Sequence, residues 1–160
     1  MHAGVREKLL LGALYISIAG AILVTAILVV PQKSTPTSEV IIGDEKVMVT
    51  IADTPALQDR GLGGVKALLQ NEGMLFVFPK PDLYTFWMKD MLIPIDIIWF
   101  DTNRHIVDVW ENAKPSSYPE ARPPRAEAQY VLEVQAGFFA RHALKRGDVL
   151  ELKSSTRYTK

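Results

Sequence analysis

The sequence predicts a mainly β domain of the α+β class, a small antiparallel barrel or sandwich-like domain with two or three short helices, and one N-terminal transmembrane helix. Apolar runs of strand length follow one another closely, and turn residues separate them. The helical stretches between them are shorter than the roughly 10 to 15 residues that a doubly wound α/β fold requires. The 160 residues have room for one such domain besides the membrane segment.

The N-terminal segment 9–30, LLLGALYISIAGAILVTAILVV, holds no charged side chain and is long enough to cross a bilayer as a helix. Arg6 and Lys8 precede it and Lys33 alone follows closely, so the positive-inside rule predicts a cytoplasmic N-terminus. A cleaved signal peptide is the alternative, although its apolar region is usually shorter. We therefore expect a single-pass membrane protein that contacts the bilayer through residues 9–30, with its domain on the extracytoplasmic side.

The rest of the chain follows from local signals. We expect five segments: a cytoplasmic N-terminus (1–8), the anchor (9–30), a Pro-, Ser- and Thr-rich tether (31–38), the β-rich domain (39–153) and a polar tail (154–160). β-Branched and aromatic runs predict strands over 39–42, 46–51, 74–78, 85–89, 93–100, 105–110, 130–134 and 149–152. Capping residues predict short helices over 54–61 and 137–145.

Two connections carry expectations of their own. Residues 101–104 form a predicted hairpin turn, in which Asn103 tolerates the left-handed conformation. Residues 111–128 hold four prolines and no apolar periodicity, which predicts a long loop and makes this segment the best candidate for a lid.

Composition and spacing argue against several function classes. The formal net charge is zero, so we expect no nucleic-acid partner. The chain has no cysteine, and its histidines (His2, His105 and His142) lack ligand spacing, so we expect no metal. The sequence contains neither a Gly-x-Ser-x-Gly elbow nor a glycine-rich phosphate loop, and we expect no cofactor.

Charged residues interrupt the most apolar part of the domain, and this contrast is the main functional clue. If 93–100 is a strand, Asp96 shares a face with Ile98 and Phe100. A carboxylate there needs a cation, several backbone N–H donors or a raised pKa, and Lys89 or Arg60 could supply the cation. The alternative is that Asp96 has only a structural role, either at the turn near Pro94 or paired with Lys89.

A second acidic residue repeats this pattern. Val131, Glu133 and Gln135 share one face of the predicted strand 130–134 and its continuation. Glu133 is therefore either solvated on an outer surface or directed into a polar cleft.

Several motifs, in order, closely resemble the family called domain of unknown function 192. The motifs are Arg60-Gly61-Leu62, GMLFVFPKP, FWMKDMLIPIDIIWFD, Ile106-Val107, the Pro115 and Tyr118 loop, YVLEVQAG and RGDVLEL. The resemblance covers about residues 40–152 and implies a small β-rich domain, often exported or membrane-anchored, without an established activity. Three positions depart from the family pattern: Asp90 and Met91 replace its usual Asn and Thr, and Gly63 replaces its Met.

The favoured hypothesis is a membrane-tethered binding or envelope-accessory domain that is not an enzyme and takes an unknown small molecule or envelope component. Its candidate ligand-binding residues are Arg60, Trp87, Lys89, Asp96, Tyr118 and Glu133. The alternative is a carboxylate-dependent hydrolase that acts on an envelope polymer, with Asp90 and Asp96 as its acid and base. A third interpretation is that these charges are wholly structural.

Overall fold

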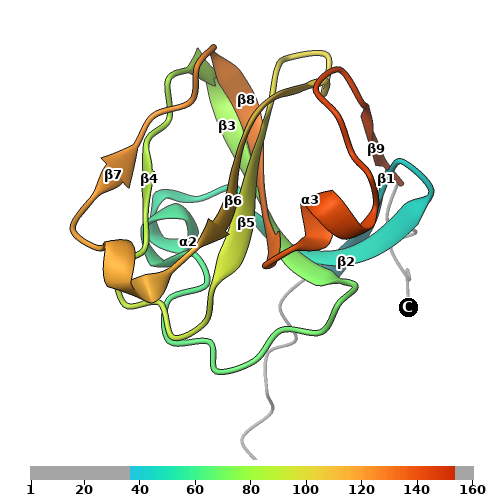
Figure 1. Cartoon of the computed structure of the whole chain (residues 1–160). Coiled ribbons are helices and arrows are strands. Elements are labelled where there is room, and N and C mark those ends of the chain that lie inside the picture. Colours follow the sequence, from blue (N-terminus) through green and yellow to red (C-terminus); the bar gives the residue numbers. More distant parts are fainter. Residues whose placement is uncertain (1–36, 154–160) are drawn as a thin grey trace, which may run out of the picture. The chain divides into compact units, whose positions relative to one another are not determined.

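The computed structural model describes residues 37–153, which form one compact β-rich unit with short helices (Figure 1). The expected N-terminal segment, membrane anchor and polar tail lie outside the described residues, as does the expected tether up to residue 36. The elements are β1 (Thr37–Ile42), β2 (Glu45–Ala52), α2 (Pro55–Arg60), β3 (Glu72–Asp82), β4 (Phe86–Trp87), β5 (Ile95–Phe100), β6 (Ile106–Ala113), η1 (Pro115–Ser117), β7 (Ala121–Arg122), β8 (Ala128–Gln135), α3 (Phe138–Arg141) and β9 (Leu150–Leu152).

The main sheet has seven strands in the order β6-β5-β8-β3-β2-β1-β9, and a separate ribbon pairs β4 with β7. All pairs are antiparallel except β2 and β3, which run parallel with α2 in the connection between them. The expectation of a mainly β fold with short helices is confirmed, although the sheet is mixed. The first residue of β6 also exchanges backbone hydrogen bonds with residues 147 and 148, so that the sheet curls into a half-barrel.

Each face of the sheet packs into its own apolar core because the side chains of a strand alternate between faces. One core is enclosed by the curled sheet and α3, and it contains Ile98, Phe100 and Leu132. The other core contains Phe76, Phe86 and Trp99, on the face that the β4–β7 ribbon covers. Strand β5 is therefore buried along its whole length.

Turn and capping residues act as the sequence predicts in the first part of the domain. Gly43 has a φ of +60° in the hairpin between β1 and β2, where a glycine costs little. Thr54 caps α2 by accepting a hydrogen bond from the backbone N–H of Leu57, at 3.4 Å, and Pro55 is its first residue. The helix ends at Gly61, which has a φ of +51°.

Three local predictions are wrong. Residues 111–128 are not one irregular loop, because they contain η1 and β7, and β7 pairs with β4. In the hairpin after β5 the left-handed residue is Arg104, with a φ of +67°, because the Asp101 carboxylate accepts the backbone N–H groups of Asn103 and His105. The helix expected over 137–145 is the single turn α3, and Ala143 at a φ of +49° accounts for its early end.

Candidate functional site: a cavity around a buried glutamate

Glu133 lies in the middle of the sheet and is only 4% exposed. Its strand β8 runs between β3 and β5, and its direct partners across the two ladders are Met74 and Ile97. Val131, Met74 and Ile97 all belong to the core beneath the β4–β7 ribbon, so the Glu133 side chain points into this core. The alternative of a solvated Glu133 on an outer surface is therefore wrong.

The Glu133 carboxyl group lines a cavity of about 420 Å³. The walls come from α2 and the turn after it, from β3 and from the segment around β4. The lining residues are Gln58, Asp59, Arg60, Gly61, Leu62, Phe76, Phe78, Tyr84, Thr85, Phe86, Trp87, Lys89, Met91 and Glu133. A cavity of this size, with aromatic walls and a few polar groups, has the usual character of a small-molecule site.

The chemistry of Glu133 is unusual because one carboxyl oxygen has no partner. Its Oε2 atom is buried and accepts no hydrogen bond from any described residue. Burial raises the pKa of Glu133 from its ordinary value of 4.5 to about 8, and the nearby backbone N–H of Leu62 opposes this rise only in part. At neutral pH the group is mostly a neutral acid, which can both donate and accept a hydrogen bond.

Three further predicted residues lie around the same cavity. Arg60 ends α2, and Lys89 and Trp87 come from β4 and the turn after it. All three side chains are exposed, and Trp87 is 53% exposed, so they belong to the accessible part of the lining. The structure therefore brings four of the six candidate ligand-binding residues to one cavity.

Asp96 is fully buried but does not line the Glu133 cavity. Its Oδ1 atom accepts the backbone N–H groups of Asn112 at 2.8 Å and Gly137 at 3.0 Å, and its Oδ2 atom accepts that of Phe139 at 2.9 Å. It makes no ion pair with Lys89 or Arg60, and it lines neither described cavity. These contacts join β5 to the end of β6 and to the start of α3, so Asp96 has a structural position.

The remaining candidates, Asp90 and Tyr118, also lie outside the cavity lining. Asp90 is exposed and has a φ of +57°, a conformation that Asn and Asp tolerate better than most residues other than Gly. Tyr118 packs edge-to-face on Trp87, with 6.4 Å between ring centroids. Because Asp90 and Asp96 share no described cavity, their geometry gives no support to an acid and base pair.

Sequence reasoning missed the groups that shape the cavity walls. Phe78 and Tyr84 stack with 3.6 Å between ring centroids, and Trp99 donates its indole N–H to the Tyr84 carbonyl at 2.9 Å. Gln58 donates its amide to the carbonyls of Ala52 and Val77, which fixes α2 against the sheet. The apolar residues in the GMLFVFPKP motif were visible in the sequence, but nothing there showed which face would enclose a cavity.

Within 37–153, no group of three or more His, Asp or Glu side chains is placed to hold a metal ion. No helix in this range has the length and apolar character needed to span a bilayer. A second cavity of about 520 Å³ shares Arg60, Gly61 and Leu62 with the first and extends over Met48 and Thr50.

Two solved structures are similar to this chain. A protein of unknown function from Novosphingobium aromaticivorans is 32% identical, with a TM-score of 0.70 over 76% of this chain and 89% of that one. A protein from Sinorhizobium meliloti, provisionally named a transcription regulator, is 27% identical, with a TM-score of 0.72 over 76% of this chain and 97% of that one. The curled sheet is therefore known from crystal structures.

Two curated relatives, each named a UPF0127 protein, are also similar. The relative from Thermococcus kodakarensis is 32% identical over 107 residues, which are 64% of this chain and 62% of the relative. The relative from Thermococcus gammatolerans is 31% identical over 104 residues, which are 64% of each chain. The match thus spans less than two thirds of these relatives. The profile of the DUF192 family, described as an uncharacterized ACR, matches residues 38–152, and the chain therefore belongs to this family.

Proposed function

We propose that the domain is a binding module for a small organic acid with an apolar body, taken up in the cavity of Glu133. The observation that carries the proposal is the buried, unpartnered Oε2 atom of Glu133 at the wall of an open cavity. A buried polar atom without a partner costs about 1–3 kcal/mol. A ligand that hydrogen-bonds to this carboxyl group removes that cost.

The rest of the lining supports an anionic ligand. With Glu133 neutral at pH 7, the charged side chains of the lining are Arg60, Lys89 and Asp59, which leaves a net charge of +1. Arg60 and Lys89 make no ion pair within the described residues. Both cations are free to pair with a ligand carboxylate, while the aromatic walls take its apolar body.

The lining favours binding over hydrolysis. It contains no serine, cysteine or histidine side chain, and neither Asp90 nor Asp96 takes part in it. Glu133 and the two cations are suited to orienting a ligand through hydrogen bonds and charge.

We also propose that residues 9–30 anchor this binding module at the extracytoplasmic face of a membrane. The support comes from the uncharged apolar run and from Arg6 and Lys8 in front of it. A C-terminal alkaline phosphatase fusion is expected to be active outside the cytoplasm, and a C-terminal reporter that works only in the cytoplasm would contradict this location.

Thermal-shift measurements on the full chain in neutral detergent test the binding proposal. The probes are benzoate and indole-3-acetate, their uncharged amides, and benzylamine as a cation. A carboxylate at 100 times its dissociation constant is expected to stabilise the native state by about 2.7 kcal/mol and to raise the melting temperature by several degrees. The matched amides are expected to raise it less.

Variants test whether the rise in melting temperature comes from binding in the Glu133 cavity. Lys89→Met is expected to weaken carboxylate binding, whereas Lys66→Met, at an exposed lysine outside the lining, leaves it unchanged. Glu133→Leu is expected to abolish the shift. Stabilisation by benzylamine alone would instead indicate an ammonium ligand paired with ionised Glu133, and no shift with any probe class would count against this proposal.

A further inference from the structure

A second buried carboxylate, that of Asp108 on β6, lies outside the cavity and is surrounded by arginines. Asp108 is fully buried. Its Oδ1 atom accepts the backbone N–H of Val109 at 2.9 Å and the Nη2 group of Arg146 at 2.8 Å. Its Oδ2 atom accepts the backbone N–H of Arg125 at 3.0 Å. Protein donors therefore already satisfy both oxygens.

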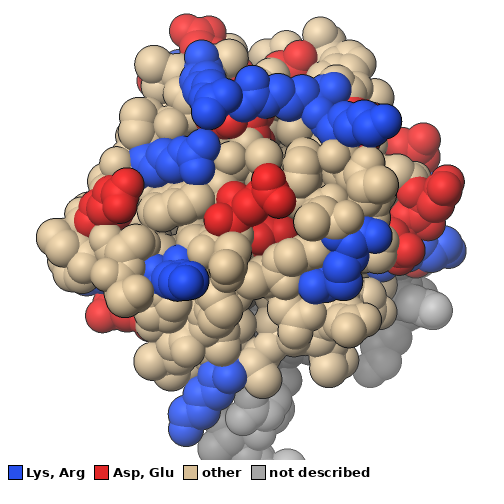
Figure 2. Space-filling model, viewed as in Figure 1, with Lys and Arg blue, Asp and Glu red and all other residues tan. Residues whose placement is uncertain are grey.

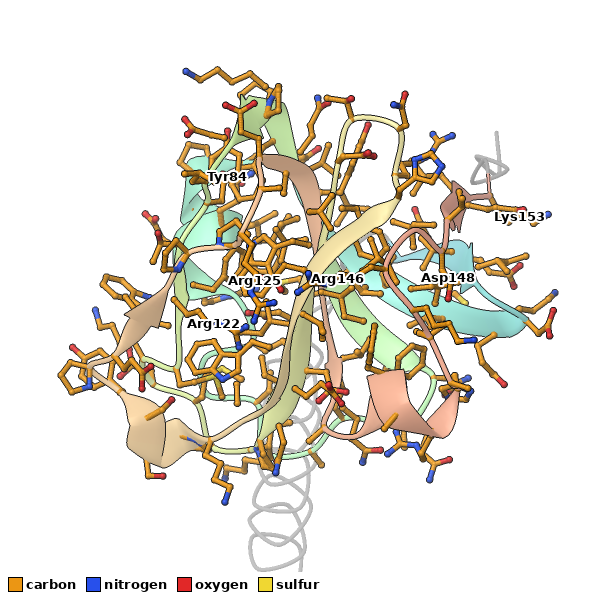
Figure 3. All side chains as sticks on the ribbon, turned by 45° about the horizontal axis from the view of Figure 1, so that its top comes forward. Tyr84, Arg122, Arg125, Arg146, Asp148 and Lys153 are labelled. Atoms are coloured by element: carbon orange, nitrogen blue, oxygen red, sulfur yellow. The ribbon has the colours of Figure 1, made fainter. Side chains whose placement is uncertain are left out.

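Three guanidinium groups from two segments of the chain gather at this carboxylate, and Figure 3 shows where Arg122, Arg125 and Arg146 lie. Arg122 lies on β7, Arg125 lies in the connection to β8, and Arg146 lies between α3 and β9. Besides the Arg146 bond, Arg122 Nη2 and Arg125 Nε each lie 4.0 Å from Asp108 Oδ1. At this distance the groups form ion pairs but no hydrogen bonds. The side-chain N–H groups of Arg122 and Arg125 therefore do not donate to the carboxylate.

The charges at this cluster do not balance. Three arginines face one carboxylate, which leaves an excess charge of +2. In residues 37–153 none of the three guanidinium groups has an ion pair with any other acidic side chain. Basic side chains form a band across the upper part of the face drawn in Figure 2.

Two of the three arginines are also held in place before any ligand arrives. Arg146 is fixed by its bond to Asp108, and Arg122 lies over the Trp110 ring, with 5.8 Å between its guanidinium carbon and the ring centroid. The three side chains nevertheless remain accessible, at 30% exposure for Arg122, 67% for Arg125 and 49% for Arg146. Accessible, oriented guanidinium groups lose little freedom when they bind an anion.

We propose that Arg122, Arg125 and Arg146 form a binding site for a single phosphoryl group. A phosphate monoester carries a charge of about −1.5 to −2 at neutral pH and three acceptor oxygens, which match the excess charge and the planar donor forks. Asp108 orients the arginines and does not touch the ligand. None of these four residues lines the Glu133 cavity, so this site is independent of the proposed function.

The obvious rival is that the cluster only fastens the segment around Arg125 and the loop of Arg146 to β6. Arg125→Ala separates the two interpretations, because it removes the guanidinium but keeps the backbone N–H that bonds to Asp108. Arg141→Ala is a matched control, since Arg141 is an exposed arginine of α3 that donates to the Ala136 carbonyl.

The test is an NMR titration of the full chain in neutral detergent with inorganic phosphate at low ionic strength, read on arginine side-chain resonances. Phosphate is expected to bind saturably. Arg125→Ala is expected to weaken binding about 10-fold at an unchanged melting temperature, by the loss of charge-assisted hydrogen bonds. Arg141→Ala is expected to bind as the wild type does. Absence of saturable binding, or equal affinity of Arg125→Ala and the wild type, would overturn the proposal.

Two further probes identify the source of the phosphoryl group. If dioctanoyl phosphatidate displaces phosphate at lower concentration than glycerol 3-phosphate does, and dioctanoyl phosphatidylcholine does not, the group belongs to a lipid; the reverse order assigns it to a soluble monoester. A duplex oligonucleotide that binds more tightly than either would overturn a single-phosphoryl site. An excess charge of +2 is small beside the roughly 6–10 phosphate contacts common in DNA binding.

Discussion

Asp96 and Glu133 are buried acidic residues on neighbouring strands. An offset of one residue in the pairing of these strands places their side chains on opposite faces of the sheet, in different surroundings. In the ladder between β5 and β8, Asp96 pairs with Val134, and Glu133 pairs with Ile97. Residues that pair directly share a face, so the two carboxylates point to opposite sides of the sheet. Asp96 meets three backbone N–H donors, whereas Glu133 keeps one oxygen without a partner and borders a cavity.

The comparison separates a structural acid from a candidate functional one. A buried carboxylate that accepts three backbone hydrogen bonds fixes the elements that donate them. A buried carboxyl group with an empty space beside it has its pKa raised and has hydrogen-bonding capacity left over. Burial alone therefore does not identify a site, and the partners of each oxygen do.

The largest expected effect is the loss of stability when Asp96 is removed. Asp96→Ala leaves the partly buried backbone N–H groups of Asn112, Gly137 and Phe139 without their acceptor, at about 1–3 kcal/mol for each donor that loses its partner. The free energy of unfolding is expected to fall by about 3 kcal/mol or more, as measured by urea unfolding. Asp90→Asn, at an exposed position that suits Asn, is the control and is expected to change it by less than about 0.5 kcal/mol.

The next effect is a pH dependence that belongs to Glu133. The native state holds the proton with a pKa of about 8, while the unfolded chain releases it near 4.5. The unfolded state therefore binds fewer protons between these values, and stability falls as pH rises, by up to about 1.4 kcal/mol per pH unit. The contribution is fully present below pH 4.5 and is lost above about pH 8.

Glu133→Gln isolates this pH dependence, because an amide of similar shape does not titrate in that range. The free energy of unfolding of the wild type minus that of Glu133→Gln is expected to decline from pH 5 to pH 8 in urea titrations. A difference that stays constant would mean that Glu133 is ionised in the native protein and would contradict its raised pKa.

A smaller loss of stability is expected when Gly61, at the turn beside Glu133, is replaced by Ala. A Cβ atom at Gly61 would lie 3.4 Å from Glu133 Oε2 and 3.4 Å from Phe76 Cζ. Gly64 provides a matched control, because it also has a positive φ and nothing lies within 4 Å of its Cβ position. Both Gly→Ala variants are expected to lose about 1–2 kcal/mol through backbone strain.

The two glycine variants are expected to differ in binding. Gly61→Ala narrows the space beside the Glu133 carboxyl group, so the most stabilising carboxylate of the thermal-shift panel should bind it more weakly, whereas Gly64→Ala binds as the wild type does. Equal affinities, measured by calorimetry, would place the ligand away from Glu133.

The smallest change in stability is expected at the exposed aromatic pair. Trp87→Ala and Tyr118→Ala each break the same edge-to-face contact, which is worth about 0.5–1.5 kcal/mol. Only Trp87 lines the cavity, so only Trp87→Ala is expected to weaken ligand binding in the same calorimetric assay. Equal weakening by both variants would extend the site to Tyr118.

The sequence by itself determined most of the elements and the facing of their side chains. β-Branched and aromatic runs predicted every strand except β7, and Thr54, Pro55 and Gly61 predicted α2 from its first residue to its end. Strand alternation placed Asp96 on the face of Ile98 and Phe100, and Glu133 on that of Val131, as the two cores confirm. These features are local, because backbone conformation and side-chain alternation depend on residues a few positions apart.

Only the tertiary structure decided which groups surround each buried acidic side chain. The donors to Asp96 lie 16, 41 and 43 residues along the chain, and the cavity of Glu133 has walls from α2, β3 and the segment around β4. The arginines around Asp108 likewise come from two separate segments, Arg122 and Arg125 from β7 and the connection after it and Arg146 from the segment between α3 and β9. Whether a buried oxygen is satisfied depends on atoms that only the closed sheet brings within hydrogen-bond distance, and no local pattern records that distance.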